Sequence, residues 1–249
     1  MKAAAWLLVA AALPAAAHHD QWLSEGFAEY SSGFFIHYVQ GDKEFKTFIN
    51  RTRDDILLVH PPNTRPTIEA GPIWLGGRLD TKKFQGAGQL IYSKGAYVLH
   101  MLRMMMYDIS RQDDGKFVNM VRDFVQPYQG RNATTEDFKA ICDKHFGQDM
   151  SWFFNQWVYG TLAPKVSVQY SLPKRGEDTF LVADISLGGV PDNFEVWVPV
   201  VFKTKQGIIS GRLRVVGKSH LETKLPVAPD EVEFDPYRSI LGDLEVRKL

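Results

Sequence analysis

The chain has 249 residues, of which 45% are hydrophobic, so it can bury the core of one large domain or two ordinary ones, and a disordered tail is excluded. Twenty-nine basic residues balance twenty-nine acidic ones without a long run of either sign, so we expect no nucleic-acid partner. The single cysteine, Cys142, excludes an internal disulfide.

Residues 1–17 differ in kind from the rest of the chain. Lys2 precedes an apolar stretch at Ala3–Ala12, and Pro14 then leads into three alanines that end at Ala17. This order predicts a secretory signal peptide cleaved after Ala17, and therefore a secreted or periplasmic protein. The apolar stretch is too short for a permanent membrane span. The alternative is an alanine-rich stretch mistaken for the start of the protein by gene prediction.

A helix is predicted from Trp22 onward, because its apolar residues recur at helical spacing: Leu23, Phe27, Tyr30 and Phe34. Glu25 lies off this stripe, on a face shared with Trp22 and Glu29. That face either meets water or lines a cleft. On periodicity alone, Glu25 is interpreted as a solvated glutamate of an amphipathic helix.

Residues 41–60 are also predicted to be helical, and residues 61–88, rich in proline and glycine, form a long irregular connection of the kind that often borders binding sites. The next predicted helix is Gln89–Asp108. Its methionines are expected to fill the core rather than to bind metal. Tyr92 shares a face with the small residues Gly95 and Ala96, which allow another element or a ligand to come close. The default interpretation of Tyr92 is a buried, hydrogen-bonded tyrosine.

Three further helices are predicted at Phe117–Phe124, Thr134–Phe146 and Met150–Tyr159. From Pro164 the period changes to short β-rich runs at Lys165–Tyr170, Thr179–Leu187, Phe194–Lys203, Ile208–Val216 and Glu231–Asp235. Such runs predict a small antiparallel β-sandwich. We therefore expect an α+β chain with a helical part at 18–163 and a sandwich at 164–249.

Two motifs carry a family resemblance. QWLSEGFAEY, which contains Glu25, is followed about 67 residues later by YSKGAYVLHML, which begins at Tyr92; FFNQWV and VPDNFEVWVPVVF come after them. In order and spacing they resemble the zinc aminopeptidases of the membrane alanyl aminopeptidase and leukotriene-A hydrolase family, the gluzincins. The resemblance covers Asp20 to Leu249. It implies the helical half of a thermolysin-like catalytic domain followed by the sandwich.

In that family, two histidines of an HExxH helix and the glutamate of WLxEGFA bind Zn²⁺, and the metal-bound water attacks a peptide carbonyl. The glutamate of HExxH takes the proton from that water. The tyrosine of YxKG hydrogen-bonds the oxyanion, a contribution of about 3 kcal/mol. The resemblance therefore implies that Glu25 is a zinc ligand, that Tyr92 is a catalytic residue, and that the substrate is a peptide shortened from its N-terminus.

The chain departs from the family pattern upstream of Glu25. The positions of the first histidine, the base and the second histidine of HExxH hold Lys2, Ala3 and Trp6. If one continuous helix ran through both residues, His18 would lie two turns from Glu25, too far for both to bind the same zinc ion. His18 and His19 could replace the missing ligands only if the helix begins after His19 and the chain before it folds back. Another alternative is copper bound by a new N-terminus at His18.

The leading hypothesis is a truncated or split zinc aminopeptidase that is inactive as an isolated chain. A separate chain carrying HExxH is then a candidate partner. The alternative, from another class, is a secreted non-catalytic protein that binds peptides or another protein on the peptidase scaffold. The missing helix also predicts uncovered apolar surface beside Trp22 and Phe27, and association through it.

Overall fold

The computed structural model describes residues 18–249, so the predicted signal peptide and the positions Lys2, Ala3 and Trp6 lie outside the described residues. The chain folds into two compact units. The helical unit runs up to Tyr107 and resumes at Asp114–Leu162, and the β unit combines Asp108–Asp113 with Ala163–Leu249. The predicted α+β class is confirmed. Within residues 18–249, no helix is both long and apolar enough to cross a membrane.

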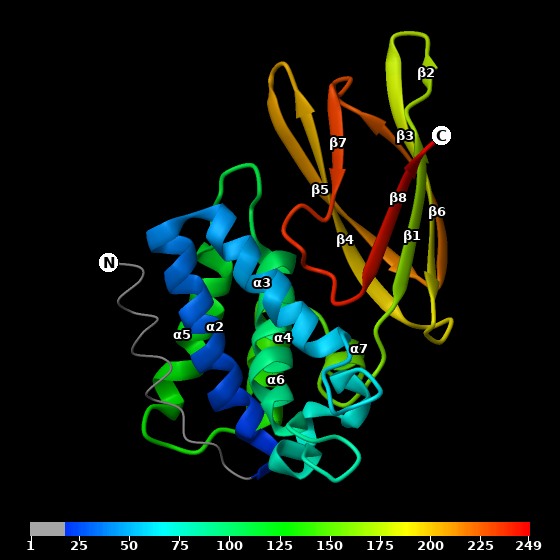
Figure 1. Cartoon of the computed structure of the whole chain (residues 1–249). Coiled ribbons are helices and arrows are strands. Elements are labelled where there is room, and N and C mark those ends of the chain that lie inside the picture. Colours follow the sequence, from blue (N-terminus) through cyan, green and yellow to red (C-terminus); the bar gives the residue numbers. More distant parts are fainter. Residues whose placement is uncertain (1–17) are drawn as a thin grey trace. The chain divides into compact units, whose positions relative to one another are not determined.

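The helical unit contains the predicted helices with shifted ends (Figure 1): α2 (Gln21–Gln40), α3 (Asp42–Leu57), α4 (Leu90–Met106), α5 (Gly115–Tyr128), α6 (Thr135–Phe146) and α7 (Ser151–Trp157). Gly41, at φ 86°, separates α2 from α3, because this backbone conformation ends one helix and turns the chain into the next. A capping box begins α6, where the Thr134 hydroxyl accepts from the Asp137 amide and the Asp137 carboxylate accepts from the Thr134 amide.

The connection between α3 and α4 is irregular, as predicted, apart from the short 3₁₀ turns η2 (Thr67–Ala70), η3 (Ile73–Leu79) and η4 (Ala87–Gln89). Two hydrogen bonds brace it. The Asn63 amide nitrogen donates to the Gln85 carbonyl, and the Gln85 backbone N–H donates to the Asn63 amide oxygen, both at 2.9 Å. The two ends of the connection are therefore fixed to each other.

The core of the helical unit corrects the expectation of uncovered apolar surface beside Trp22 and Phe27, although Phe27 itself lies in the core as its place in the apolar stripe predicted. Trp22 and Phe27 are 0% and 1% exposed, so the apolar surface predicted beside them is covered. The Phe27 ring lies 5.5 Å from the ring of Phe138 in α6, and the Trp22 ring packs edge-on against the same ring. Helical periodicity missed this because α6 covers a second face of α2. The exposed apolar residues of α2 are instead Phe35, Tyr38 and Val39.

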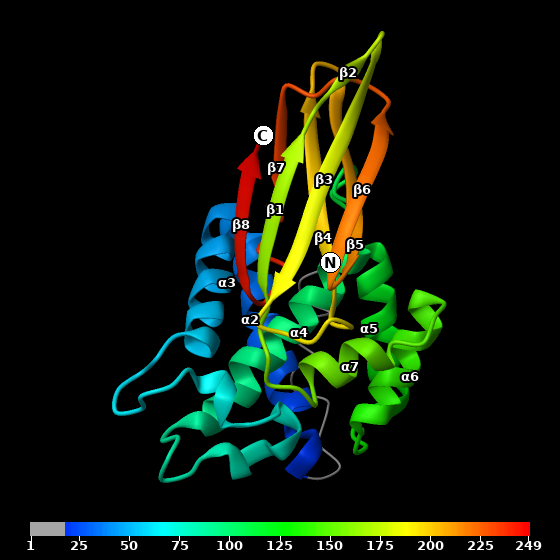
Figure 2. The same cartoon turned by 90° about the vertical axis from the view of Figure 1, so that its right-hand side faces the viewer.

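The β unit contains two sheets, which Figure 2 shows as two layers. One sheet has the order β2-β3-β1-β8, with β6 also paired to β3: β1 (Lys165–Ser171), β2 (Lys174–Arg175), β3 (Asp178–Gly188), β6 (Lys218–Leu225) and β8 (Asp243–Lys248). The other has the order β5-β4-β7: β4 (Glu195–Thr204), β5 (Gly207–Val216) and β7 (Glu231–Phe234). Tyr170 of β1 and Phe234 of β7 join the two sheets, with ring centroids 5.1 Å apart. The sandwich is not wholly antiparallel, because β8 pairs with β1 in parallel.

Candidate active site

The first turns of α2 position Glu25. Two interactions fix this end of α2 to the start of α6. The buried Asp20 carboxylate accepts hydrogen bonds from the Thr135 amide at 2.7 Å and from its hydroxyl at 2.9 Å. The Trp22 indole N–H donates to the same hydroxyl at 3.0 Å. Glu25, one turn further along α2, is half-buried.

Two glycines let α2 and α4 touch backbone to backbone. A Cβ atom added at Gly26 would lie 2.8 Å from the Gly95 backbone, and one added at Gly95 would lie 2.9 Å from the Gly26 Cα. Any larger residue forces the helices apart. Because Glu25 precedes Gly26 and Tyr92 lies about one turn before Gly95, this contact brings the two predicted site residues together.

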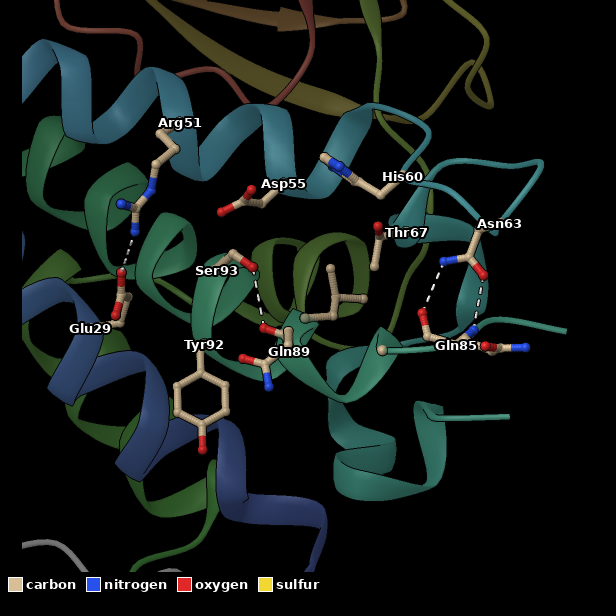
Figure 3. Close-up of a pocket in the computed structure, with 12 residues that line it drawn as sticks. Glu29, Arg51, Asp55, His60, Asn63, Thr67, Gln85, Gln89, Tyr92 and Ser93 are labelled. Atoms are coloured by element: carbon tan, nitrogen blue, oxygen red, sulfur yellow. Dashed lines mark hydrogen bonds and ion pairs between the residues drawn. The ribbon is translucent and has the colours of Figure 1, made fainter. Parts of the chain in front are cut away.

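The Tyr92 side chain lies close enough to Glu25 for the Glu25 carboxylate to act on its pKa. Figure 3 shows the Tyr92 side chain reaching from α4 toward α2. Partial burial raises the pKa of Tyr92, and the charge of Glu25 raises it further, because a phenolate beside a carboxylate is unfavourable. Tyr92 therefore keeps its proton around neutral pH and is a hydrogen-bond donor.

The described residues do not by themselves fit a zinc ion. A zinc site needs at least three protein ligands, and within residues 18–249 no three His, Cys, Asp or Glu side chains form a group that could hold a metal. Helix α2 does begin after His19, as a substitute site would require. However, the His19 ring stacks on Trp74 with centroids 3.9 Å apart, and its Nδ1 lies 3.2 Å from the Trp74 carbonyl oxygen. Glu25 remains a candidate for one ligand position.

A pocket of about 390 Å³ borders Tyr92 (Figure 3). It lies among α2, α3, the α3–α4 connection and the start of α4, and the polar residues that line it include Glu29, Arg51, Asp55, His60, Asn63 and Tyr92. The closest approach of Arg51 to Glu29 is 3.9 Å, at the outer edge of ion-pair range, and the Arg51 side chain is 72% exposed. The pocket is therefore polar and carries both signs of charge.

The sequence pointed only in part to this pocket. Glu29 was placed on the face of Glu25, and the connection at 61–88 was expected to border a binding site. Arg51 and Asp55 were not identified, although their spacing of four residues puts them on one face of a helix. Periodicity alone does not say which other element that face meets.

A buried lysine lies behind the candidate site. Lys94 follows Tyr92 by two residues, is 0% exposed, and donates from Nζ to the Gly160 carbonyl oxygen at 2.7 Å. Burial lowers the pKa of Lys94 to about 7, because a charged ammonium loses its hydration inside the protein. The motif YSKGAYVLHML did not indicate that its lysine is buried or that the pKa of this lysine is lowered.

Residues 15–157 match the Peptidase family M1 domain, and this stretch is more than half of the 249-residue chain. The chain belongs to peptidase family M1. The match confirms the resemblance predicted from the motifs around Glu25 and Tyr92.

The chain covers only part of two proteins to which it is similar. It is 27% identical over 203 residues to Aminopeptidase 2, mitochondrial, of Saccharomyces cerevisiae, which corresponds to 76% of this chain and 19% of that protein. The crystal structure of Legionella pneumophila aminopeptidase A in complex with aspartic acid matches with a TM-score of 0.65 and 16% identity, over 94% of this chain and 25% of that chain. The second likeness confirms the fold. The M1 chain thus spans only a fifth to a quarter of these two proteins.

Proposed function

We propose that this M1 chain takes part in removing N-terminal residues from peptides, with Glu25 as one zinc ligand and Tyr92 as the donor to the oxyanion. The observation that carries the proposal is the close contact of α2 with α4 at Gly26 and Gly95, which places the Glu25 carboxylate where it acts on the Tyr92 hydroxyl. Two motif residues that lie far apart in the sequence meet there, at the edge of a pocket that accommodates part of a peptide.

Tyr92 supplies hydrogen-bond donation in this proposal. Its raised pKa keeps the hydroxyl protonated, so it can donate to the negative charge that develops on the carbonyl oxygen during hydrolysis. Loss of one such donor lowers kcat by about 100- to 1000-fold in other hydrolases.

Because the described residues offer Glu25 but no complete ligand set, we place the remaining zinc ligands and the general base on a separate chain or segment that carries HExxH. The isolated chain is then inactive. Zinc, once bound by the complete set, would supply the acidic water that attacks the peptide carbonyl.

Complementation tests the proposal. The chain is co-expressed with the HExxH-bearing segment of an M1 catalytic domain, and zinc content and hydrolysis of an aminoacyl anilide are measured. We expect zinc and turnover only in the combined sample. Glu25→Gln should lose zinc, whereas Tyr92→Phe should keep zinc and lose about 100-fold or more in kcat. Tyr38→Phe is the matched control, because Tyr38 is 63% exposed on α2.

Two results would count against the proposal. Stoichiometric zinc with chelator-sensitive turnover in the isolated chain would show that no further ligands are needed. Unchanged turnover in both Glu25→Gln and Tyr92→Phe would remove these residues from the site.

A second candidate is peptide binding without hydrolysis, which the pocket beside Tyr92 favours because it is formed by this chain alone. Peptide affinity that is unchanged by Glu25→Gln, in a chain that no HExxH segment activates, would support it.

We also propose that residues 1–17 are a cleaved secretory leader, on the basis of their composition. N-terminal sequencing of the mature protein, which should begin at His18, tests that point.

A further inference from the structure

We propose that the pocket bordered by Asp55 and Glu29 binds the cationic side chain of a peptide, a lysine or an arginine. This inference rests on the proposed function and names a substrate class for it.

The carboxylates in the pocket outnumber the permanent cations. Asp55, on α3, is exposed and forms no ion pair or hydrogen bond with the described part of the chain. Glu29 is paired with Arg51 only loosely, at 3.9 Å. Figure 3 shows the Arg51 guanidinium directed toward Glu29, with Asp55 one helical turn further along α3. One negative charge therefore has no partner, and the favoured ligand is a cation.

The walls of the pocket are largely preformed. The paired hydrogen bonds between Asn63 and Gln85 fix the rim, and the Ser93 hydroxyl donates to the Gln89 carbonyl oxygen at 3.2 Å. Leu90 also borders the pocket but is 0% exposed, so it supports the wall from behind. Because these groups are already fixed, little ordering cost opposes binding.

The volume selects a ligand of limited size. About 390 Å³ lies near the lower end of the range for small-molecule sites, so one long side chain with its own backbone fills it, but a folded domain does not. Tyr92 lines the pocket and also lies close to Glu25, so a peptide whose basic side chain occupies the pocket lies next to the proposed catalytic residues.

The test uses single residues whose α-amine and α-carboxylate are blocked, so that only the side chain can carry charge: Nα-acetyl-lysine amide, Nα-acetyl-norleucine amide and Nα-acetyl-glutamate amide. Binding to the full isotope-labelled chain is followed by NMR titration without added metal. Because an exposed ion pair adds little, we expect the lysine probe to bind about fivefold more tightly than the norleucine probe. Asp55→Asn should abolish this preference, so that the lysine and norleucine probes bind about equally. Asp55→Lys should reverse the preference, so that the glutamate probe binds more tightly than the lysine probe.

Glu44→Gln is the matched control, because Glu44 is an exposed carboxylate of the same helix that does not line the pocket, so the preference should stay unchanged. Equal binding of all three probes, or tighter binding of the glutamate probe to the unaltered chain, would overturn the inference; the second result would make Arg51 the anchoring group. Since the titration needs neither zinc nor an HExxH segment, failure here leaves the proposed hydrolysis standing. Failure of complementation likewise leaves the pocket result standing.

Discussion

Glu25 and Tyr92 illustrate how the proximity of two side chains changes the chemical role of each. Glu25 alone is a half-buried glutamate, and Tyr92 alone is a partly exposed tyrosine. Side by side they form an acid–phenol pair in which burial and the neighbouring carboxylate raise the pKa of Tyr92, so the phenol keeps its proton. The chemistry of the site therefore depends on the pair rather than on either side chain.

Replacing Glu25 tests this coupling directly. Glu25→Gln removes the negative charge that disfavours the phenolate, so the pKa of Tyr92 should fall toward the ordinary tyrosine value of about 10. NMR titration of ring-labelled tyrosine, with Tyr92→Phe to assign the signal, measures the change. Glu29→Gln is the control, because Glu29 lies one turn further along α2 and does not contribute to the Tyr92 shift. An unchanged Tyr92 pKa in Glu25→Gln would show that the Glu25 carboxylate does not act on Tyr92 in solution.

At the level of secondary-structure elements, the pair of Glu25 and Tyr92 depends on the contact between helices α2 and α4. Gly26 and Gly95 remove the side chains that would separate the two helices, while the contacts of Asp20 and Trp22 with Thr135 fix the start of α2. The first interaction sets the spacing of the helices, and the second fixes α2 against α6. Both must hold for the Glu25 carboxylate to reach the Tyr92 hydroxyl.

Gly26→Ala should separate the helices. Helix propensity alone would make this substitution stabilising by up to about 1 kcal/mol. A Cβ atom 2.8 Å from the Gly95 backbone has no side chain to displace, so we expect a net loss of about 1–3 kcal/mol in the free energy of unfolding, together with a fall in the Tyr92 pKa. Urea unfolding and the tyrosine titration measure the two effects. Gly88→Ala is the control, since its nearest neighbour, the Asp80 Cβ, lies 3.9 Å away; equal effects of the two substitutions would contradict the close contact.

Elements with strong periodicity could be predicted, and those defined by tertiary contacts could not. The helices and the long strands were found because their apolar residues repeat at a fixed period. Strands β6 and β8 were missed because most of their side chains are polar or exposed, so no alternation marks them. Trp22 was placed on an open face because the sequence does not show that α6 covers it. The same limit hid Asp55, whose importance depends on what α3 faces.

The whole molecule has a formal net charge of zero, yet two basic side chains, Lys94 and Arg103, are buried in the helical unit. Arg103 is compensated, because Asp114 accepts two hydrogen bonds from its guanidinium at 2.7 and 2.8 Å. The Lys94 ammonium donates to the neutral Gly160 carbonyl, and burial alone accounts for its lowered pKa. A buried charge that lacks a counter-ion lowers stability, so Lys94 should make the unfolding free energy depend on pH.

The sign of this dependence follows from the two pKa values of Lys94. The unfolded chain holds the proton up to about pH 10.5, whereas the folded chain releases it near pH 7, so between these values the unfolded state binds one more proton. Stability should therefore rise with pH from about 7 to about 9, by at most about 1.4 kcal/mol per pH unit. Above the ordinary cysteine pKa of 9.0, buried Cys142 acts in the opposite sense, which sets the upper limit of the useful range.

Urea unfolding at several pH values, for the original chain and for Lys94→Met, isolates the contribution of Lys94. The variant should lose most of the rise with pH, because methionine fills the buried space without a proton to release. Lys46→Met is the matched control: Lys46 is exposed on α3, so the slope of the original chain should persist. Parallel slopes in the original chain and in Lys94→Met would mean that Lys94 keeps its charge in the folded protein. The ammonium would then be stabilised well beyond what the Gly160 carbonyl alone provides.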